Sequence, residues 1–115
     1  MSDHAIIIAD TTGHITRWNS AAETLFGYPA SRALGESLDL IVPEELRDAH
    51  WRGFFRAMAN PEIRDLAADL PVRCADGTTR HVAGRLLVLS DGLGTAIGAM
   101  AIFTATGSTG IRPFG

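Results

Sequence analysis

The sequence has little of what marks a secreted, membrane-bound or nucleic-acid-binding protein. Its 115 residues include one cysteine, Cys74, which cannot form an internal disulfide. No apolar run reaches the roughly 18 residues that cross a bilayer, and the amino-terminal segment has no basic region or cleavage site. A formal net charge of −3 gives no electrostatic attraction to DNA, RNA or anionic lipid. We therefore expect a cytoplasmic protein with no nucleic-acid or membrane partner.

Motifs of catalysis are also missing. The chain has no phosphate-binding loop, zinc-binding pair or nucleophile elbow. The adjacent carboxylates Glu44 and Glu45 are better interpreted as the charge of a helix start. Cys74 has no histidine or cationic cluster next to it in the sequence that would lower its pKa, so we interpret it as a packing residue. We do not expect an enzyme.

What the sequence does contain is typical of a single small globular domain. Hydrophobic residues make up 46% of the chain and charged residues 20%, which is ordinary for a folded protein. A chain of this length can build one modest core. We expect the domain to span residues 1–106 and the glycine-rich residues 107–115 to form a flexible tail.

The first half of the chain alternates strand and helix signals. The apolar run 5–9, a turn at 10–13 and the alternating segment 14–18 predict a β-hairpin. Ser20 and Glu23 have the spacing of a capping box, so a short helix should begin there and end at Gly27. Further along, one helical turn is expected over residues 30–34.

The second half is strand-like apart from one long helix. The segments 66–74, 80–89 and 95–106 predict strands joined by turns at Asp76-Gly77 and Asp91-Gly92. With the amino-terminal hairpin they make an α+β domain, a five-stranded antiparallel sheet with helices packed on one face.

The long helix, IVPEELRDAHWRGFFRAM over residues 41–58, carries the candidate binding residues. Pro43 suits its first turn. At about 100° per residue, Leu46, His50 and Gly53 fall on one face together with Phe54 and Ala57. His50 is therefore expected to point towards the interior. Gly53 costs about 1 kcal/mol against alanine in a helix, which suggests that something flat or bulky passes close to the backbone there.

From end to end these features resemble a PAS domain. The resemblance rests on AIIIADTTGHITRWNSAAETLFGY, with its D-x-x-G-x-I-x-x-W-N core and its E-x-x-F-G-Y, on IVPEELRDAH, and on RCADGTTRHVAGRLLVL with AIGAMAIFT. PAS domains sense ligands or other signals, commonly dimerise, and pass the change to a kinase, cyclase, transcription factor or chemoreceptor. The resemblance implies the PAS fold, a signal-input role, a homodimer and a downstream effector that the sequence does not identify.

Within that family, PEELRDAHWRGFFRAM is similar to the haem-bearing helix of FixL-type oxygen sensors. The similarity implies haem b, with His50 as the proximal iron ligand and Arg56 as the partner of a haem propionate. Gly84 and Leu86 should then face the far side of the haem, where a diatomic gas would bind. Those sensors use a strand arginine to hydrogen-bond oxygen, whereas the corresponding residues 66–68 here are apolar. No flavin is expected, because the adduct-forming cysteine motif of the photochemical branch is absent.

Other interpretations stay open. His50 could be a core histidine bonded to a backbone carbonyl, in a metal-free PAS module that binds a small apolar or carboxylate ligand or acts as a dimerisation unit. The chain could also be a fragment of a larger signalling protein with no ligand role. Trp51, which the helical periodicity places off the His50 face, is expected to be exposed and to form a dimer contact with Phe55 and Met58.

Overall fold

The computed structural model describes residues 4–61 and 65–104, which form one five-stranded antiparallel sheet and a set of helices. The expected tail, residues 107–115, and the end of the expected last strand, residues 105–106, lie outside this part of the chain. The sheet order is β2-β1-β5-β4-β3, so the first and last thirds of the chain meet at its centre. The strands are β1 (Ala5–Ala9), β2 (Ile15–Trp18), β3 (Asp65–Arg73), β4 (Thr79–Ser90) and β5 (Ala96–Thr104). The predicted α+β fold class is confirmed.

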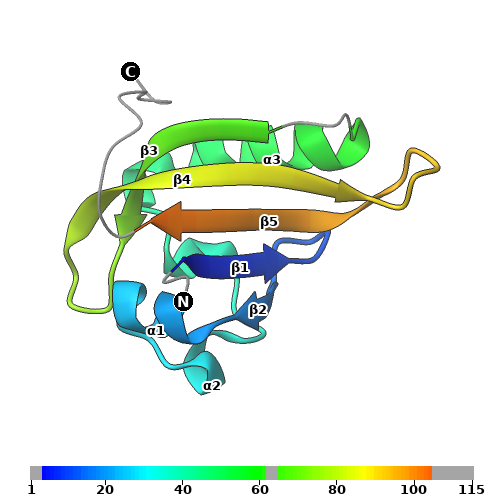
Figure 1. Ribbon diagram of the computed structural model, residues 1–115. Coiled ribbons are helices and arrows are strands. Elements are labelled where there is room, and N and C mark those ends of the chain that lie inside the picture. The colour runs from blue at the N-terminus through cyan, green and yellow to red at the C-terminus, as the bar shows by residue number, and fades with distance from the viewer. Residues whose placement is uncertain (1–3, 62–64, 105–115) are drawn as a thin grey trace.

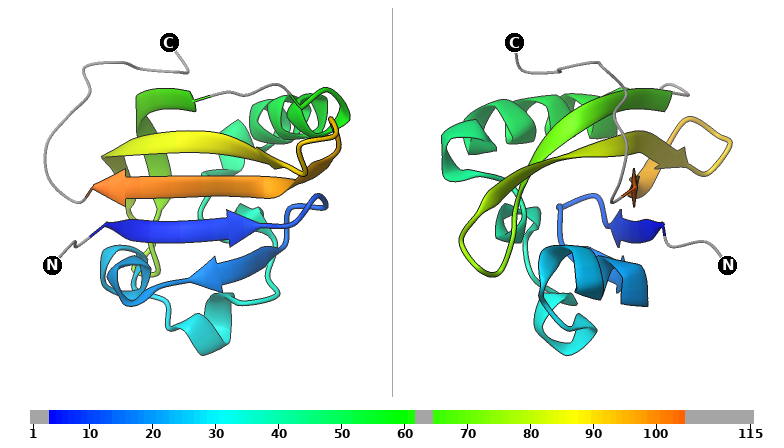
Figure 2. Two further views of the ribbon diagram at one scale, coloured as in Figure 1. Left: turned by 45° about the vertical axis from the view of Figure 1, so that its right-hand side comes forward. Right: turned by 60° about the vertical axis from the view of Figure 1, so that its left-hand side comes forward.

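The helices gather on one face of the curved sheet (Figures 1 and 2). They are α1 (Ser20–Phe26), α2 (Ala30–Ala33), the short 3₁₀ turns η1 (Leu38–Leu40) and η2 (Glu44–Leu46), and α3 (Arg47–Ala59). The expected long helix is thus divided: Pro43 precedes a 3₁₀ turn, and regular α-helix begins only at Arg47. A curved sheet and its helix layer can leave a space between them, and the candidate site lies in this space.

Hydrogen bonds among Asp10, Thr12 and His14 hold the turn between β1 and β2. The Asp10 carboxylate accepts from the backbone N–H groups of Thr12 and His14, both at 3.0 Å. These bonds lower the pKa of Asp10, the bond from His14 contributing most. Gly13 closes the turn with φ of 84°, a left-handed conformation that favours glycine.

The cap of α1 differs from the expected one. Asn19, not Ser20, is the N-cap residue, and its side-chain oxygen accepts from the N–H of Ala22 at 2.9 Å and from that of Ile6 at 3.0 Å. Glu23 does not complete a capping box, because its carboxylate accepts the N–H of Ala30 at 2.6 Å. Asn19 therefore ties the start of α1 to β1, and Glu23 ties α1 to α2. The expected end at Gly27 is confirmed, with φ of 85°.

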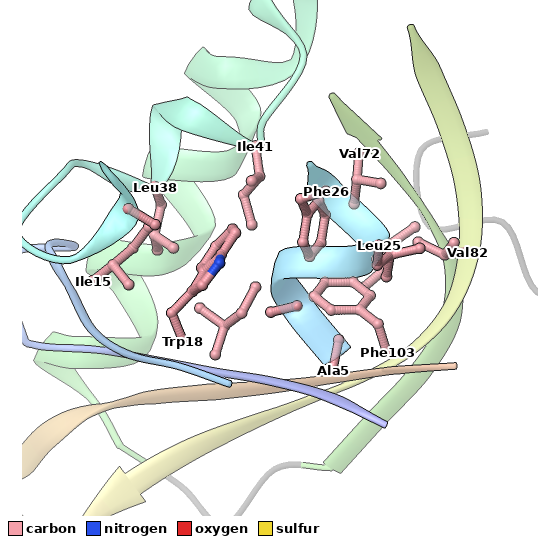
Figure 3. Packing of buried hydrophobic residues seen from close by; sticks show 14 of the residues in the cluster. Ala5, Ile15, Trp18, Leu25, Phe26, Leu38, Ile41, Val72, Val82 and Phe103 are labelled. Atoms are coloured by element: carbon pink, nitrogen blue, oxygen red, sulfur yellow. The ribbon is translucent and has the colours of Figure 1, made fainter. Parts of the chain in front are cut away.

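The hydrophobic core lies between the sheet and α1 (Figure 3). Phe26 is fully buried; its ring meets Phe103 edge-on at 5.4 Å and Trp18 at 5.2 Å. The Trp18 indole N–H donates to the carbonyl of Tyr28 at 2.9 Å, which satisfies its one polar atom. Cys74 is buried in the same cluster, and burial raises its pKa, in agreement with the expected packing role.

Candidate functional site

A cavity of about 370 Å³ lies between α3 and the sheet. Its wall is built from α3, η1, η2 and the strands β1, β3, β4 and β5, and nearly all of its side chains are aliphatic or aromatic. His50 is the one titratable side chain among the residues that line it. A volume of this size falls in the range of small-molecule sites, about 300–1,000 Å³. The cavity is thus an apolar pocket with one imidazole in its wall.

The His50 imidazole lines the cavity, and one of its two nitrogens has no hydrogen-bond partner among the described residues. Its Nδ1 atom is buried and makes no hydrogen bond to any described residue. Desolvation lowers the pKa of His50, and the charge of Asp39 opposes this shift. The ring is therefore held in its neutral form, which is the form that ligates a metal. Leaving a buried polar atom such as Nδ1 without a partner costs free energy.

The alternative of a structural core histidine would require a bond to a backbone carbonyl. Among the described residues Nδ1 makes no such bond. The ring instead makes contacts with its aromatic neighbours: its centroid lies 4.8 Å from the Trp51 ring and 5.9 Å from the Phe54 ring.

The cavity opens to solvent beside α3. Ala49, Gly53 and Leu86 line it and are also exposed, so the opening lies between the middle of α3 and β4. A Cβ atom added to Gly53 would meet no heavy atom within 4 Å outside its own helix. Gly53 therefore leaves space at the mouth. The flat or bulky neighbour that the sequence suggested is not another element of the described part of the chain.

Gly53→Ala should stabilise the ligand-free protein by about 0.5–1 kcal/mol, because alanine is the better helix former and the new methyl group meets open space. Chemical denaturation would measure this. The matched control is Gly13→Ala, which should destabilise, because Gly13 has φ of 84° and a Cβ there would overlap the Trp51 ring. Equal effects of the two substitutions would contradict this account of the mouth.

The structure brings together most of the residues that the sequence singled out. Leu46, His50, Gly53 and Leu86 all line the cavity. Gly84 does not: it is buried in β4, and a Cβ there would lie 2.7 Å from Leu70 Cδ1 and 3.0 Å from Phe103 Cδ1. The room expected beside Gly84 is thus filled by these two side chains.

Arg56 lies on the outside of α3. Its side chain is exposed and does not belong to the cavity wall. Being three residues after Gly53, it lies one helical turn from the mouth, where it could meet an acidic group of a ligand that extends from the cavity.

The prediction of an exposed surface around Trp51 is wrong. The indole is half-buried, and its N–H donates to the Asp39 carboxylate at 2.7 Å. The far ring of the indole covers Gly13. Met58 is half-buried and lines the cavity, and of the three residues only Phe55 is largely exposed, at 51%. These side chains do not form the predicted open contact patch.

Two further residues lie near the site, and the first of them, Asp39, had no signal in the sequence that we recognised. Asp39, in η1, binds the Trp51 indole and lies 3.8 Å from Arg47 Nε. Phe54 is buried between the cavity and the aromatic residues of α3. A conserved pairing of position 39 with position 51 in related sequences would have indicated the first of them.

Two further features concern metals and membranes. Among residues 4–61 and 65–104, no three histidine, cysteine or acidic side chains lie together as a metal site. Within the same part of the chain no helix has the length and hydropathy of a membrane span.

Together, an antiparallel sheet, a helical layer on one face and an apolar pocket between them are typical of a sensory input domain. The chain belongs to the PAS fold family, whose model matches residues 2–108. It is a PAS signal-input domain.

Curated relatives match over part of the chain. The sensor protein FixL of Bradyrhizobium diazoefficiens is 31% identical over 77 residues, which are 65% of this chain and 15% of that protein. An uncharacterized protein of Azorhizobium caulinodans is 37% identical over 59 residues, which are 50% of this chain and 8% of that protein. The chain thus spans less than a sixth of the length of these relatives.

Solved structures share the fold at low sequence identity. A PAS domain from Colwellia psychrerythraea superposes with a TM-score of 0.75 at 20% identity, covering 90% of this chain and 86% of that one. The PAS domain of the quorum-sensing receptor RpfR from Cronobacter turicensis, in complex with C12:0, gives 0.72 at 18% identity and covers 90% and 94% of the two chains.

Proposed function

We propose that this domain is a haem-based sensor of gas or redox state, with His50 as the proximal iron ligand of haem b. The observation that carries the proposal is the His50 imidazole, the one titratable side chain in the wall of an otherwise apolar cavity. Imidazole is the usual proximal ligand of haem iron in globins and peroxidases. The similarity to the sensor protein FixL over 65% of the chain supports it further.

The residues present fit the group in three respects. His50 supplies a neutral nitrogen donor, since burial lowers its pKa. The aliphatic wall suits the apolar faces of a macrocycle, and the mouth at Gly53 leaves space for its acidic edge. Arg56, exposed on the next turn of α3, would pair with a propionate through its planar guanidinium.

When bound, haem iron would supply an open coordination position for a diatomic gas. The protein's own part is to exclude water and to set the polarity around that position. Apart from His50, no lining residue carries a side-chain N–H or O–H donor. We therefore expect a gas that needs no hydrogen bond from the protein to be favoured over one that does, in contrast to sensors with an arginine in that place.

Reconstitution with haem tests the proposal. The wild-type domain should show a Soret band with one haem per chain, and His50→Ala should lose it or bind haem with a shifted, weaker spectrum. The matched control is His81→Ala, because His81 is exposed on β4 and does not line the cavity. A wild-type protein that remains colourless, or a His50→Ala protein with an unchanged spectrum, would contradict haem ligation by His50.

A second candidate is a metal-free PAS module that binds a small apolar carboxylate. It is favoured by the almost wholly aliphatic wall with an arginine one turn from its mouth, and the RpfR neighbour, of the same fold, was solved with C12:0. This ligand would need Arg56 and the cavity but not the imidazole. A thermal shift with C12:0 that survives His50→Ala and is lost in Arg56→Glu would support it.

In either case the domain would control an effector outside this sequence, as a homodimer or in contact with another domain. The matched relatives are several times longer than this chain, and one of them is a sensor protein, which supports an output domain elsewhere in the full protein.

A further inference from the structure

A metal-binding histidine is ordinarily oriented by a hydrogen bond on its second ring nitrogen. His50 has no such bond among the described residues, although its Nδ1 atom is buried. Something else must define the plane of the ring, because a side chain on a helix next to an open cavity can otherwise rotate about its terminal torsion.

The Trp51 indole is placed to do this. It meets the His50 ring edge-on, with ring centroids 4.8 Å apart and an interplanar angle of 73°. Edge-to-face contacts of this kind are among the preferred arrangements of aromatic rings. Phe54 borders the imidazole at 5.9 Å and meets Trp51 edge-on at 5.3 Å, so the three rings form one cluster.

The indole itself is fixed from outside α3. Its N–H donates to the Asp39 carboxylate at 2.7 Å. Asp39 is held in turn, because its carbonyl accepts from Arg47 Nη2 at 3.3 Å and its N–H donates to Ser37 Oγ at 3.2 Å. The far ring lies over Gly13, where any side chain would collide with it. Trp51 is thus tied both to η1 and to the β1–β2 turn.

We infer that Trp51, locked by Asp39, is a positioning residue for His50: the indole fixes the plane in which the imidazole faces the cavity. The inference rests on the proposed function in so far as His50 is the residue that meets the ligand. It adds that η1 and the β1–β2 turn are linked to the ring through the indole, which contacts His50, Asp39 and Gly13.

The first test needs no ligand. Ring carbon and proton signals of His50 in the unliganded protein, assigned by their loss in His50→Gln, should be single and sharp in wild type. Trp51→Ala and Asp39→Ala should broaden or split them, since the ring then samples several orientations. Asp39→Asn should keep the wild-type pattern, because its amide oxygen still accepts the indole hydrogen bond. If the effect of Asp39→Ala came from the lost negative charge, Asp39→Asn would show the same broadening.

Phe55→Ala is the matched control. Phe55 also stacks on Trp51, at 5.4 Å and 23°, but it is largely exposed, and in the described part of the chain its ring makes no contact with that of His50. This variant should leave the His50 signals unchanged. If Trp51→Ala fails to fold, Asp39→Ala and Trp51→Phe keep the test open, because each removes the indole hydrogen bond with a smaller loss of packing.

The second test uses haem-reconstituted protein. Removing outer partners of a metal ligand typically weakens the metal site by about 10- to 100-fold, so Trp51→Ala should release haem faster by a factor in that range. His50 signals unaffected by Trp51→Ala and Asp39→Ala would overturn the inference whatever haem does. A wild-type protein that takes up no haem, with His50 signals that do respond, would instead overturn haem sensing and leave the positioning role in place.

Discussion

Replacing Phe26 with alanine should unfold much of this domain at moderate temperature. Phe26 is fully buried at the end of α1, and its ring contacts both Trp18 and Phe103. Truncating a buried phenylalanine costs about 3–5 kcal/mol, of which part is the cavity left behind. A domain of this size has a total stability of about 5–15 kcal/mol, so the loss removes a large part of it.

Circular dichroism during heating would measure the effect. A change of 1 kcal/mol moves the Tm of a domain near 100 residues by about 4–8 °C, so the midpoint should fall by roughly 12–40 °C. Leu93→Ala is the control, because Leu93 is 90% exposed and its removal should cost no more than about 0.5 kcal/mol. A Phe26→Ala midpoint within a few degrees of wild type would contradict the packing of α1 against the sheet.

Much of this fold could be predicted from local signals. The turn at Asp10–Gly13, the glycine at position 27 and the two Asp-Gly turns mark where elements end, because each requires a short polar side chain or a positive φ. The cap of α1 could not be chosen in this way. Both Asn19 and Ser20 suit a helix start, and what favours Asn19 is a bond to Ile6 in β1, which lies 13 residues away in the sequence.

The candidate site was predictable only along a single helix. The periodicity of residues 46–57 places Leu46, His50 and Gly53 on one face, and the structure puts this face against the cavity. Contacts between different helices and strands could not be predicted from the sequence. Nothing in the sequence says that Leu70 and Phe103 fill the space beside Gly84, or that Asp39 reaches Trp51 from a separate turn. For the same reason Trp51 seemed exposed, since the hairpin turn that covers it is remote in sequence.

Filling the cavity from the sheet side should abolish ligand uptake whatever the ligand is. Ala101 lies in the middle of β5, lines the cavity and pairs with Ile7 and Leu86 on the neighbouring strands. Ala101→Leu would place three more carbons in this space. At about 0.8 kcal/mol for each buried CH₂, the unliganded protein could gain up to about 2 kcal/mol, provided that the larger side chain enters the cavity without strain.

The same change should weaken binding of haem or of C12:0 by at least about tenfold, because a ligand would have to displace a buried side chain, and 1.4 kcal/mol already corresponds to that factor. The control is Ala67→Leu, at an exposed alanine of β3 outside the cavity wall, which should alter neither property. Equilibrium titration and thermal denaturation of both variants separate the outcomes. A more stable Ala101→Leu protein that binds neither ligand establishes the cavity as the binding site, whereas unchanged affinity would move the site elsewhere and remove the basis for a role of His50.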